Sequence, residues 1–522
     1  MGKGSKSIVA GMTVLGITGI ICKLVGVLFS IPLTWLIGAD GLGVFQAVFP
    51  TYNLLLTVSS AGLPVAVSRM VSHCLAKDDP RSAKQVFRIA LTLLTALGCV
   101  CTILMLAGSA MLAARVSQPE SQLGFQVIAP CVAIVCMLSA FRGFMQGQQN
   151  MMPTAISQLI EQCGKVFVSL PLSYWGARID IAHGAAGALL GITIVEAAAL
   201  VYMIILYYRK RRGFEAIPQL SQDDPIPGST LAKRLLFISI PITISACIVP
   251  LSQFVDSAML VDRMMATGMT LEQARPVYGL FTGLVIRLIN VPTALALAIS
   301  MSLVPAISSA RATEDYAAVK RQSDLGLRFA FLIGLPCSIG MSLLSRNIIA
   351  FFYQETLSAE HLRIASELLS VSSLTVVLFT VVQATTSILQ GLHYQRIPMY
   401  TLIAGVVCKI VLNYILVGIP GIDIHGAPIS SIVCYTVSMV PNLYFVLRHG
   451  RMRLNLSGWI VRPGIATAVM SLAVWGLRAL LPVSRLITIA EIAVGVIVYV
   501  AVALAVKAVS PEDFRTLRRR KA

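Results

Sequence analysis

Charged side chains lie inside several long apolar segments of this chain, where each of them needs a partner. A charge at the centre of a lipid bilayer costs about 2.5–3.5 kcal/mol on insertion scales, so such residues pair with one another, reach water or hold a ligand. The chemistry open to them is ion pairing, proton binding or recognition of an anionic group. The residues concerned are Lys23, Glu161, Lys165, Glu196, Asp256, Arg287 and Lys409.

Glu161 and Lys165 are spaced for pairing within one helix. Residues four apart lie on the same helical face, so this acid and this base can form an ion pair. We favour a structural ion pair here over a role in substrate binding. Glu196 stands alone in its apolar segment. We expect it to be a protonated or hydrogen-bonded packing residue rather than a proton carrier.

Lys409 and Asn413 repeat the same spacing in the second half of the chain. The acidic partner is missing there, because position 405 is Gly. This asymmetry leaves Lys409 freer than Lys165. One turn of helix does not indicate what it would bind.

Lys23 and Arg287 are the candidates for binding an anionic headgroup. No acid lies one helical turn from Lys23, and Asp256 is the candidate internal counter-ion. Two alternatives stay open: a water-filled cavity that receives the headgroup, or neutralisation of one base by Asp256 while the other reaches an interface. The remaining polar residues that would line such a cavity are Asn53, Gln253 and Asn290.

The composition of the chain is that of a membrane protein. Of its 522 residues 57% are hydrophobic and only 12% are charged, about half of the ~25% that is usual in soluble domains. A soluble fold and a disordered chain are both excluded by these values. The net charge of +18 fits the excess of Lys and Arg in cytoplasmic loops, which we favour over nucleic-acid binding. The 11 cysteines show no CxxC or Cys/His ligand spacing, so we predict neither disulfides nor a metal site.

The apolar segments predict an all-α polytopic protein with about fourteen transmembrane helices. A helix needs ~20 apolar residues to cross a bilayer. The predicted spans are 8–36, 44–70, 86–113, 124–141, 154–175, 184–208, 235–261, 277–305, 327–345, 364–390, 398–418, 427–447, 460–481 and 486–508.

The distribution of basic residues predicts that both termini are cytoplasmic. With fourteen spans, the segments on the side of the termini hold 29 Lys and Arg, whereas the opposite loops hold 8. This is the bias expected of cytoplasmic loops. The predicted location is the bacterial cytoplasmic membrane.

An internal repeat divides the chain. Matching residues occur in the same order and about 241–245 positions apart: Pro64 and Pro305, Gln146 and Gln390, Pro153 and Pro398, Lys165 and Lys409, and His183 and His425. Each half holds six spans, so the repeat is parallel and the fold is two pseudo-symmetric six-helix lobes plus two C-terminal helices. We predict an N-lobe at 1–208, a cytoplasmic linker at 209–232, a C-lobe at 233–448, and two helices with a basic cytoplasmic tail at 449–522.

Motifs for ATP-driven or zinc-dependent chemistry do not occur in the sequence. It contains neither GxxxxGK[ST] nor HExxH. We therefore predict no cofactor, and an energy source in a Na⁺ or H⁺ gradient, the membrane potential or downhill removal of product. Two equivalent bundles suit alternating access, in which one bundle rocks against the other.

Four segments of the chain resemble a known family. They are ICKLVGVLFSIPLTWLIGADGLGVFQAVFPTYNLLLTVSSAGLPVAVSRMV at 21–71, RGFMQGQQNMMPTAISQLIEQ at 142–162, SIPITISACIVPLSQFVDSAML at 239–260 and INVPTALALAISMSLVPAISSA at 289–310. Their order and residue types are similar to those of stage V sporulation protein B-like polysaccharide biosynthesis proteins. The wider group is the multidrug/oligosaccharidyl-lipid/polysaccharide exporter (MOP) superfamily, which includes the MurJ-type lipid II flippases.

The resemblance implies a flippase for an undecaprenyl-pyrophosphate-linked saccharide, with lipid II as the expected substrate. It implies that Lys23 matches a basic position that meets the diphosphate in a central cavity. Relatives tend to carry a further Arg near 29–30, where this chain has Phe29 and Ser30, and Arg287 is the candidate to replace that charge. The partners implied are the lipid-linked oligosaccharide, membrane lipids and cell-wall synthesis proteins, with no nucleic acid.

Two other functions compete with this one. A cation-coupled multidrug exporter has the same fold, but net acid is expected in its cavity, whereas Lys23 and Arg287 outnumber Asp256 here. An integral-membrane polysaccharide polymerase needs catalytic residues on a sizeable outside loop. The largest outside loop, at about 262–276, has no recognisable catalytic set, so we predict that the protein is not an enzyme.

Overall fold

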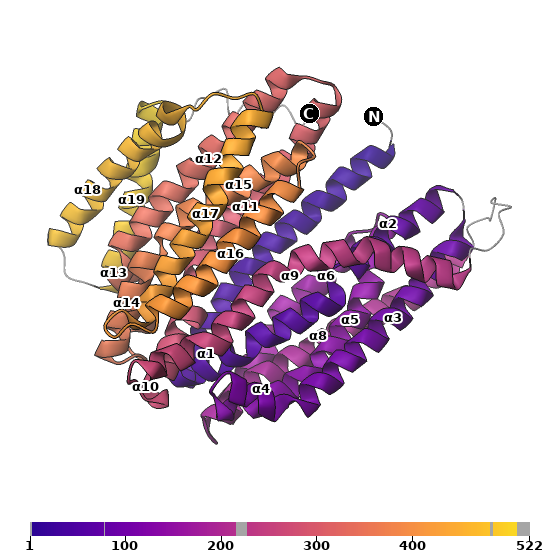
Figure 1. Cartoon of the computed structure of the whole chain (residues 1–522), viewed down its shortest axis with the longest axis horizontal. Helices are drawn as coiled ribbons and strands as arrows, with labels where there is room; N and C mark the ends of the chain where they lie inside the picture. The colour runs from indigo at the N-terminus through magenta and orange to yellow at the C-terminus, as the bar shows by residue number, and fades with distance from the viewer. Residues whose placement is uncertain (1–2, 78, 216–226, 481–483, 509–522) are drawn as a thin grey trace. The chain divides into compact units, whose positions relative to one another are not determined.

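The computed structural model describes residues 3–77, 79–215, 227–480 and 484–508. Part of the predicted linker, and the basic tail beyond residue 508, lie outside the described residues. The chain forms two units, Met1–Gly279 and Leu280–Ala522. All elements of the described part are helical (Figure 1), which confirms the all-α prediction.

The first unit contains the helices of the N-terminal part of the chain. They are α1 (Lys3–Ser60), α2 (Leu63–Ala76), α3 (Pro80–Ala107), α4 (Ser109–Arg115), η1 (Pro119–Ser121), α5 (Gln122–Gly147), α6 (Met152–Gly164), η2 (Lys165–Ser169), α7 (Leu170–Ala177), α8 (Ile181–Glu215), α9 (Gly228–Ala266) and α10 (Leu271–Gly279). Helices α1, α2, α3, α5 and α8 contribute most of its apolar core.

The second unit contains the remaining helices. They are η3 (Leu280–Val285), α11 (Ile286–Ala312), α12 (Tyr316–Leu343), α13 (Ser345–Tyr353), α14 (Ala359–Ser372), α15 (Leu374–Gly391), α16 (Arg396–Leu416), η4 (Asp423–His425), α17 (Gly426–His449), η5 (Ser457–Val461), α18 (Arg462–Leu480) and α19 (Arg485–Ala505).

The helices α18 and α19 are joined to the rest of the second unit by polar contacts. The indole Nε1 of Trp459, just before α18, donates to Asp324 Oδ1 on α12 at 2.8 Å. The hydroxyl of Tyr499 on α19 donates to the Leu332 carbonyl at 2.7 Å. Because α12 receives both contacts, it fixes both C-terminal helices to this unit.

Twelve helices in the described residues are long and apolar enough to cross a membrane. Two features account for the difference from fourteen. The second part of α1 and α2 form one continuous candidate span, Leu28–Ala76, which covers part of the predicted span 8–36 and all of 44–70. The predicted span 154–175 is divided into α6, η2 and α7. The count of fourteen crossings therefore stays a prediction, whereas the membrane fold itself is confirmed.

Helix α1 consists of two helical segments that meet at a kink at Gly38. Gly38 has φ 66° and ψ −171°, and a side chain at this backbone conformation would be strained. Pro32 and Pro50 lie in the same helix, and each removes a helical hydrogen bond. The polar stretch GADG at 38–41, in the gap between the predicted spans 8–36 and 44–70, contains this kink.

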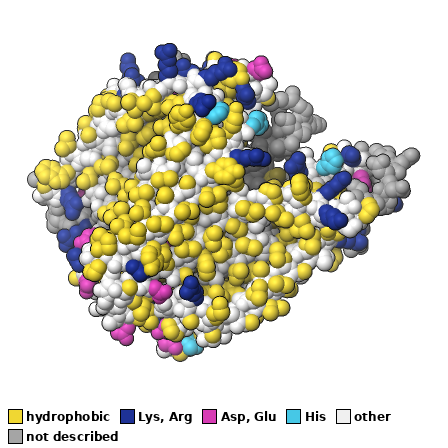
Figure 2. Space-filling model, in the orientation of Figure 1, with side chains coloured by type: hydrophobic (Ala, Val, Ile, Leu, Met, Phe, Trp, Pro, Cys, Tyr) yellow, Lys and Arg dark blue, Asp and Glu magenta, His cyan; other side chains and the backbone are white. Residues whose placement is uncertain are grey.

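The described side chains fit a lipid environment. Figure 2 shows hydrophobic side chains over most of the visible face, with many of the Lys, Arg, Asp and Glu side chains toward its margins. Large apolar residues such as Leu472, Trp475 and Leu486 are exposed on the C-terminal helices. In water such surface would be unfavourable, but lipid tails cover it at no cost.

Helix α9 packs on α1, α2 and α3 in the first unit. Its neighbour α10 lies close to the bend of α1, where a Cβ on Gly279 would come within 2.5 Å of the Gly43 nitrogen. Arg275 on α10 also forms an ion pair with Glu120 of η1 at 2.7 Å. The boundary between the units thus follows α10. The lobe boundaries at 208 and 233, which rest on sequence repetition, stay a prediction.

Residues matched by the internal repeat occupy similar places in the two units. His183 lies at the start of α8, and its backbone N–H donates to Asp180 Oδ1 at 2.7 Å, which lowers the pKa of that carboxyl below its ordinary value. His425 lies at the start of α17, and its Nε2 is 3.2 Å from the Glu367 carboxylate. Each matched histidine is therefore paired with an acid beside the first turn of a long helix.

A test of this packing is the close contact between α8 and η2. A Cβ on Gly191 would lie 2.3 Å from the Cα of Ser169, a backbone atom that cannot move aside alone. We expect Gly191→Ala to lower the free energy of unfolding in detergent by about 1–3 kcal/mol. Gly476→Ala on α18 is the control, because a Cβ there meets nothing within 4 Å. Equal stability of the two variants would contradict this packing.

Candidate functional site

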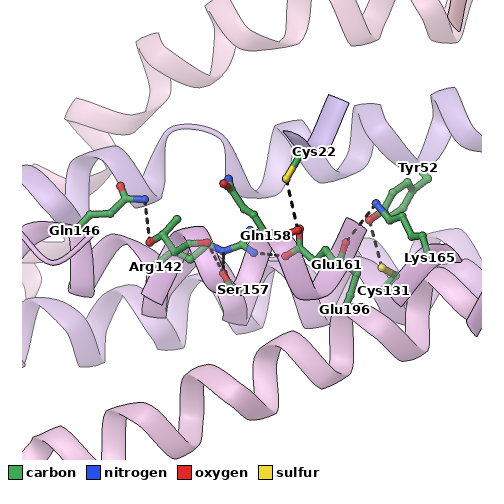
Figure 3. Close-up of polar contacts among 11 residues, drawn as sticks. Cys22, Tyr52, Cys131, Arg142, Gln146, Ser157, Gln158, Glu161, Lys165 and Glu196 are labelled. Carbon is green, nitrogen blue, oxygen red and sulfur yellow. Dashed lines mark hydrogen bonds and ion pairs between the residues drawn. The ribbon is translucent and has the colours of Figure 1, made fainter. Parts of the chain in front are cut away.

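Three of the predicted intramembrane charges of the first unit, Glu161, Lys165 and Glu196, meet with Arg142 in one cluster between α5, α6, η2 and α8 (Figure 3). We call Arg142, Glu161, Lys165 and Glu196 the tetrad. Their side chains are 14%, 9%, 17% and 7% exposed, respectively. Two bases and two acids are thus withdrawn from solvent together, so each charge needs an opposite charge close by.

Arg142 and Glu161 form the tight half of the tetrad. The guanidinium Nη2 of Arg142 on α5 donates to the Glu161 carboxylate on α6. Its Nε donates to Ser157 Oγ at 2.9 Å, and Ser157 lies one turn before Glu161 on α6. Two donors of one planar guanidinium therefore hold α6 against α5, which fixes the orientation of the ion pair.

Lys165 and Glu196 form the loose half of the tetrad. The Lys165 Nζ is 4.0 Å from Oε1 of Glu196 on α8, beyond hydrogen-bonding distance. The other carboxylate oxygen of Glu196, Oε2, is buried without a hydrogen-bond donor among the described residues. This half is therefore poorly satisfied, although it is as deeply placed as the first.

These pairs correct the predicted pairing of Glu161 with Lys165. The i, i+4 rule assumes a regular α-helix, but the chain changes to a π-helical turn, η2, at Lys165. Both residues instead take partners from neighbouring helices, Glu161 from α5 and Lys165 from α8. The sequence suggested that Glu196 stands alone, because its own apolar segment holds no other charge. In the structure Lys165 lies opposite it.

Sequence reasoning placed Arg142 in a cytoplasmic segment and missed it as a site residue. The structure extends α5 to Gly147, so Arg142 lies inside this helix. The signal in the sequence was the continued helical spacing of apolar residues beyond it. Phe144 and Met145 follow Arg142 on α5, and both are buried. The helix therefore continues past the charge.

Helix α1 borders the tetrad at two points. The hydroxyl of Tyr52, which is 3% exposed, is 3.2 Å from the Cys131 sulfur on α5. The thiol of Cys22 contacts the Gln158 carbonyl on α6 at 3.7 Å. Figure 3 shows Tyr52 beside Lys165 and Glu196. It shows Cys22 next to Gln158, which precedes Glu161 on α6. The helix that carries the predicted substrate residue Lys23 therefore also borders the buried charges.

The other predicted site residues of the first unit have different environments. The side chain of Lys23 lies outside the described residues. Asn53 is half-buried on α1, Asp256 is buried on α9 and has an interaction partner, and Gln253 is exposed. Gln253 and Asp256, which were expected to share a face of one helix, thus differ in their access to solvent or lipid.

In the second unit, Arg287 is half-buried on α11, and the Tyr353 hydroxyl lies within electrostatic range of it. Asn290, one turn further along α11, is exposed. Lys409 is half-buried and has an interaction partner, so the missing acid at position 405 does not leave it free. Asn413 is fully buried and accepts a hydrogen bond from Ser430, which gives it a structural role between α16 and α17.

Family profiles match most of the chain. The profile described as "Polysaccharide biosynthesis protein" matches residues 8–311, and the MatE profile matches residues 281–415. Among curated relatives, the chain is 25% identical to the lipid II flippase MurJ of Bacillus subtilis, over 85% of this chain and 83% of that protein. It is also 25% identical to stage V sporulation protein B of B. subtilis, over 80% of each chain.

Solved structures share the fold. A structure of the lipid II flippase MurJ in an inward closed conformation has a TM-score of 0.71 at 12% identity, over 93% of this chain and 97% of that one. An inward-facing multidrug resistance MATE family transporter of the MOP superfamily has a TM-score of 0.70 at 17% identity, over 84% of this chain and 98% of that one. These matches and the profiles confirm the resemblance seen in the sequence.

The tight half of the tetrad is open to a double-mutant test. Arg142→Met leaves the Glu161 charge buried without its base, and Glu161→Gln leaves Arg142 without its acid. We expect each to lower the free energy of unfolding in detergent by about 3–5 kcal/mol, and Arg142→Met/Glu161→Leu to lose less than either. The measurement is the denaturation midpoint of the purified protein.

The control is the ion pair Arg363–Glu367 on α14, whose side chains are 66% and 43% exposed. Arg363→Ala and Arg363→Met should change the same free energy by no more than about 0.5 kcal/mol. If the Arg142 and Glu161 variants behave like these exposed ones, the tetrad does not stabilise the helix packing.

Proposed function

The chain belongs to the polysaccharide biosynthesis protein family, and we propose that it flips an undecaprenyl-pyrophosphate-linked saccharide from the inner to the outer leaflet. It is an integral membrane protein with the fold of MOP-superfamily transporters. The observation that carries the proposal is the match to the lipid II flippase MurJ of B. subtilis along most of both chains. Lipid II, the peptidoglycan precursor, is therefore the proposed substrate.

Lys23 and Arg287 are the proposed diphosphate-binding residues. A diphosphate is recognised by charge-assisted hydrogen bonds from Lys and Arg, of which the planar guanidinium is the more directional donor. The half-buried position of Arg287 on α11 supports this role, because partial removal from solvent strengthens such bonds. Asn53, Gln253, Asp256 and Asn290 are proposed to complete the polar lining for the headgroup.

The proposed orientation places both termini in the cytoplasm. It is supported by the 29 to 8 distribution of Lys and Arg between the two sides of the predicted topology. In this orientation the protein would take up lipid II from the cytoplasmic leaflet, where it can reach the headgroup. We propose alternating access between the two repeats as the transport cycle.

A cation-coupled multidrug exporter is the second candidate. The likeness to the MATE family transporter supports it, because the same fold serves that function. Its ligands would be organic cations, which are attracted by acidic cavities. The predicted excess of base over acid at Lys23, Arg287 and Asp256 favours an anionic ligand instead.

The test is transport by the purified full-length protein in proteoliposomes. The measurement is the appearance of the headgroup of a labelled lipid II analogue on the opposite leaflet. We expect Lys23→Ala and Arg287→Ala each to slow it by about tenfold or more, since each removes a charge-assisted hydrogen bond of about 1.5–3 kcal/mol.

Lys320→Ala and Arg346→Ala serve as matched controls, because both side chains are exposed. They should leave the rate within about twofold of the wild type, consistent with loss of an exposed charge. An organic-cation dye is tested in parallel. Dye transport without lipid II transport would favour the multidrug exporter, and wild-type lipid II transport by both cavity variants would refute the proposed binding residues.

A further inference from the structure

The two acids of the tetrad have no acidic counterparts in the second repeat. With the offsets of the matched pairs Lys165/Lys409 and His183/His425, Glu161 corresponds to Gly405 and Glu196 to Ser438. These two residues face one another across α16 and α17, where a Cβ on Gly405 would lie 2.5 Å from Ser438 Oγ. The same helix crossing is therefore closed by small residues in one repeat and occupied by two carboxyl groups in the other.

Packing alone does not require carboxyl groups at this crossing. The second repeat shows that Gly and Ser bring the helices together, with Ser438 Oγ bonded to the backbone of its own helix at 2.9 Å. Burying two acids and two bases instead costs desolvation that hydrophobic or small residues avoid. The charges in the first repeat therefore point to a function beyond holding α6 and α8 together.

Glu196 is the member of the tetrad that is suited to binding a proton. The residue is 5% exposed, and its Oε2 has no donor among the described residues. Lys165 Nζ stays 4.0 Å from its other oxygen. A proton on Oε2 would remove the buried negative charge, whereas the Glu161 carboxylate is already satisfied by Arg142.

The groups around Glu196 support this assignment. It is faced by Glu161 of α6, Lys165 of η2 and Arg142 of α5, and it interacts electrostatically with Tyr52 of α1 and Cys131 of α5. Arg142 and Glu161 pair with one another, but the Glu161 carboxylate also acts electrostatically on Glu196, and so does Lys165. Proton binding changes the net charge of the tetrad from zero to +1 and leaves Lys165 without its counter-charge.

We propose that Glu196 is a proton-binding site whose occupancy drives the conformational cycle, an inference that rests on the proposed transport function. Protonation breaks the Lys165–Glu196 pair, and release of the proton restores it. Tyr52 and Cys22 of α1 contact Cys131 of α5 and Gln158 of α6, the helices that carry Arg142 and Glu161. A shift of these helices is therefore passed to α1, which also carries Lys23. A proton entering the cell down its gradient would thus drive a lipid-linked saccharide outward.

The first experiment measures protonation without any substrate. Infrared difference spectra of the purified protein between acidic and alkaline pH should show a buried carboxyl C=O band that Glu196→Gln abolishes. Glu491→Gln is the matched control, since Glu491 is 1% exposed in α19 and its carboxylate accepts from Asn347 at 2.6 Å. That variant should keep the band. Persistence of the band in Glu196→Gln would refute the proposal.

Lys165→Gln provides a second variant if Glu196→Gln does not fold. Loss of the positive charge favours the protonated acid, so the band should persist to higher pH than in the wild type. An unchanged titration would contradict the pairing of Lys165 with Glu196 on which the site depends.

The second experiment measures transport with an imposed pH gradient and the membrane potential clamped at zero. For one proton per cycle, a gradient of one pH unit should change the wild-type rate by up to about tenfold. Glu196→Gln should lose this response and Glu491→Gln should keep it. A full response in Glu196→Gln would refute the proposal. A titrating Glu196 band in a wild-type protein that moves no lipid II would instead refute the substrate assignment.

Discussion

The fold depends on the requirement that every charge withdrawn from water within a helix bundle be balanced by a neighbouring helix. In the first unit this requirement is met by the tetrad, which joins α5, α6, η2 and α8. Arg142 makes the strongest contribution, because its two donors bind Glu161 and Ser157 on one face of α6. The surrounding apolar contacts are non-directional, so these polar bonds are what fix the helices in one register.

The two repeats show how one helix arrangement supports different chemistry. In the second unit the crossing of α16 and α17 relies on Gly405, Ser438 and the buried Asn413, which accepts from Ser430. These are neutral contacts that hold in a single protonation state. In the first unit the corresponding helices meet through charges, and the strength of a charged contact depends on proton occupancy. A transporter whose two halves were both neutral at this crossing would lack such an adjustable contact.

The sequence predicted the helical membrane fold because apolar runs and charge bias act locally and need no knowledge of helix packing. It identified Glu161, Lys165 and Glu196 as residues that require partners for the same reason. It did not predict which partners they take, since Arg142 and Glu196 lie in other helices and distance along the chain says little about contact across a bundle. The π-helical turn at Lys165 was missed because local backbone geometry departs there from the regular helix, whereas the kink at Gly38 falls in the gap between the predicted spans 8–36 and 44–70.

The charge balance of the tetrad and the chemistry proposed for substrate binding favour a separation of tasks. A diphosphate carries several negative charges and is bound by basic groups, the role proposed for Lys23 and Arg287. A tetrad in which bases and acids already balance offers little net attraction to such a ligand, and a single proton is the smallest change that can unbalance it. Helix α1 carries Lys23 and contacts Gln158 of α6 and Cys131 of α5 through Cys22 and Tyr52, so one helix would link the proposed proton site with the proposed diphosphate site. Coupling between the two then requires only that α1 take up different positions in the two charge states of the tetrad.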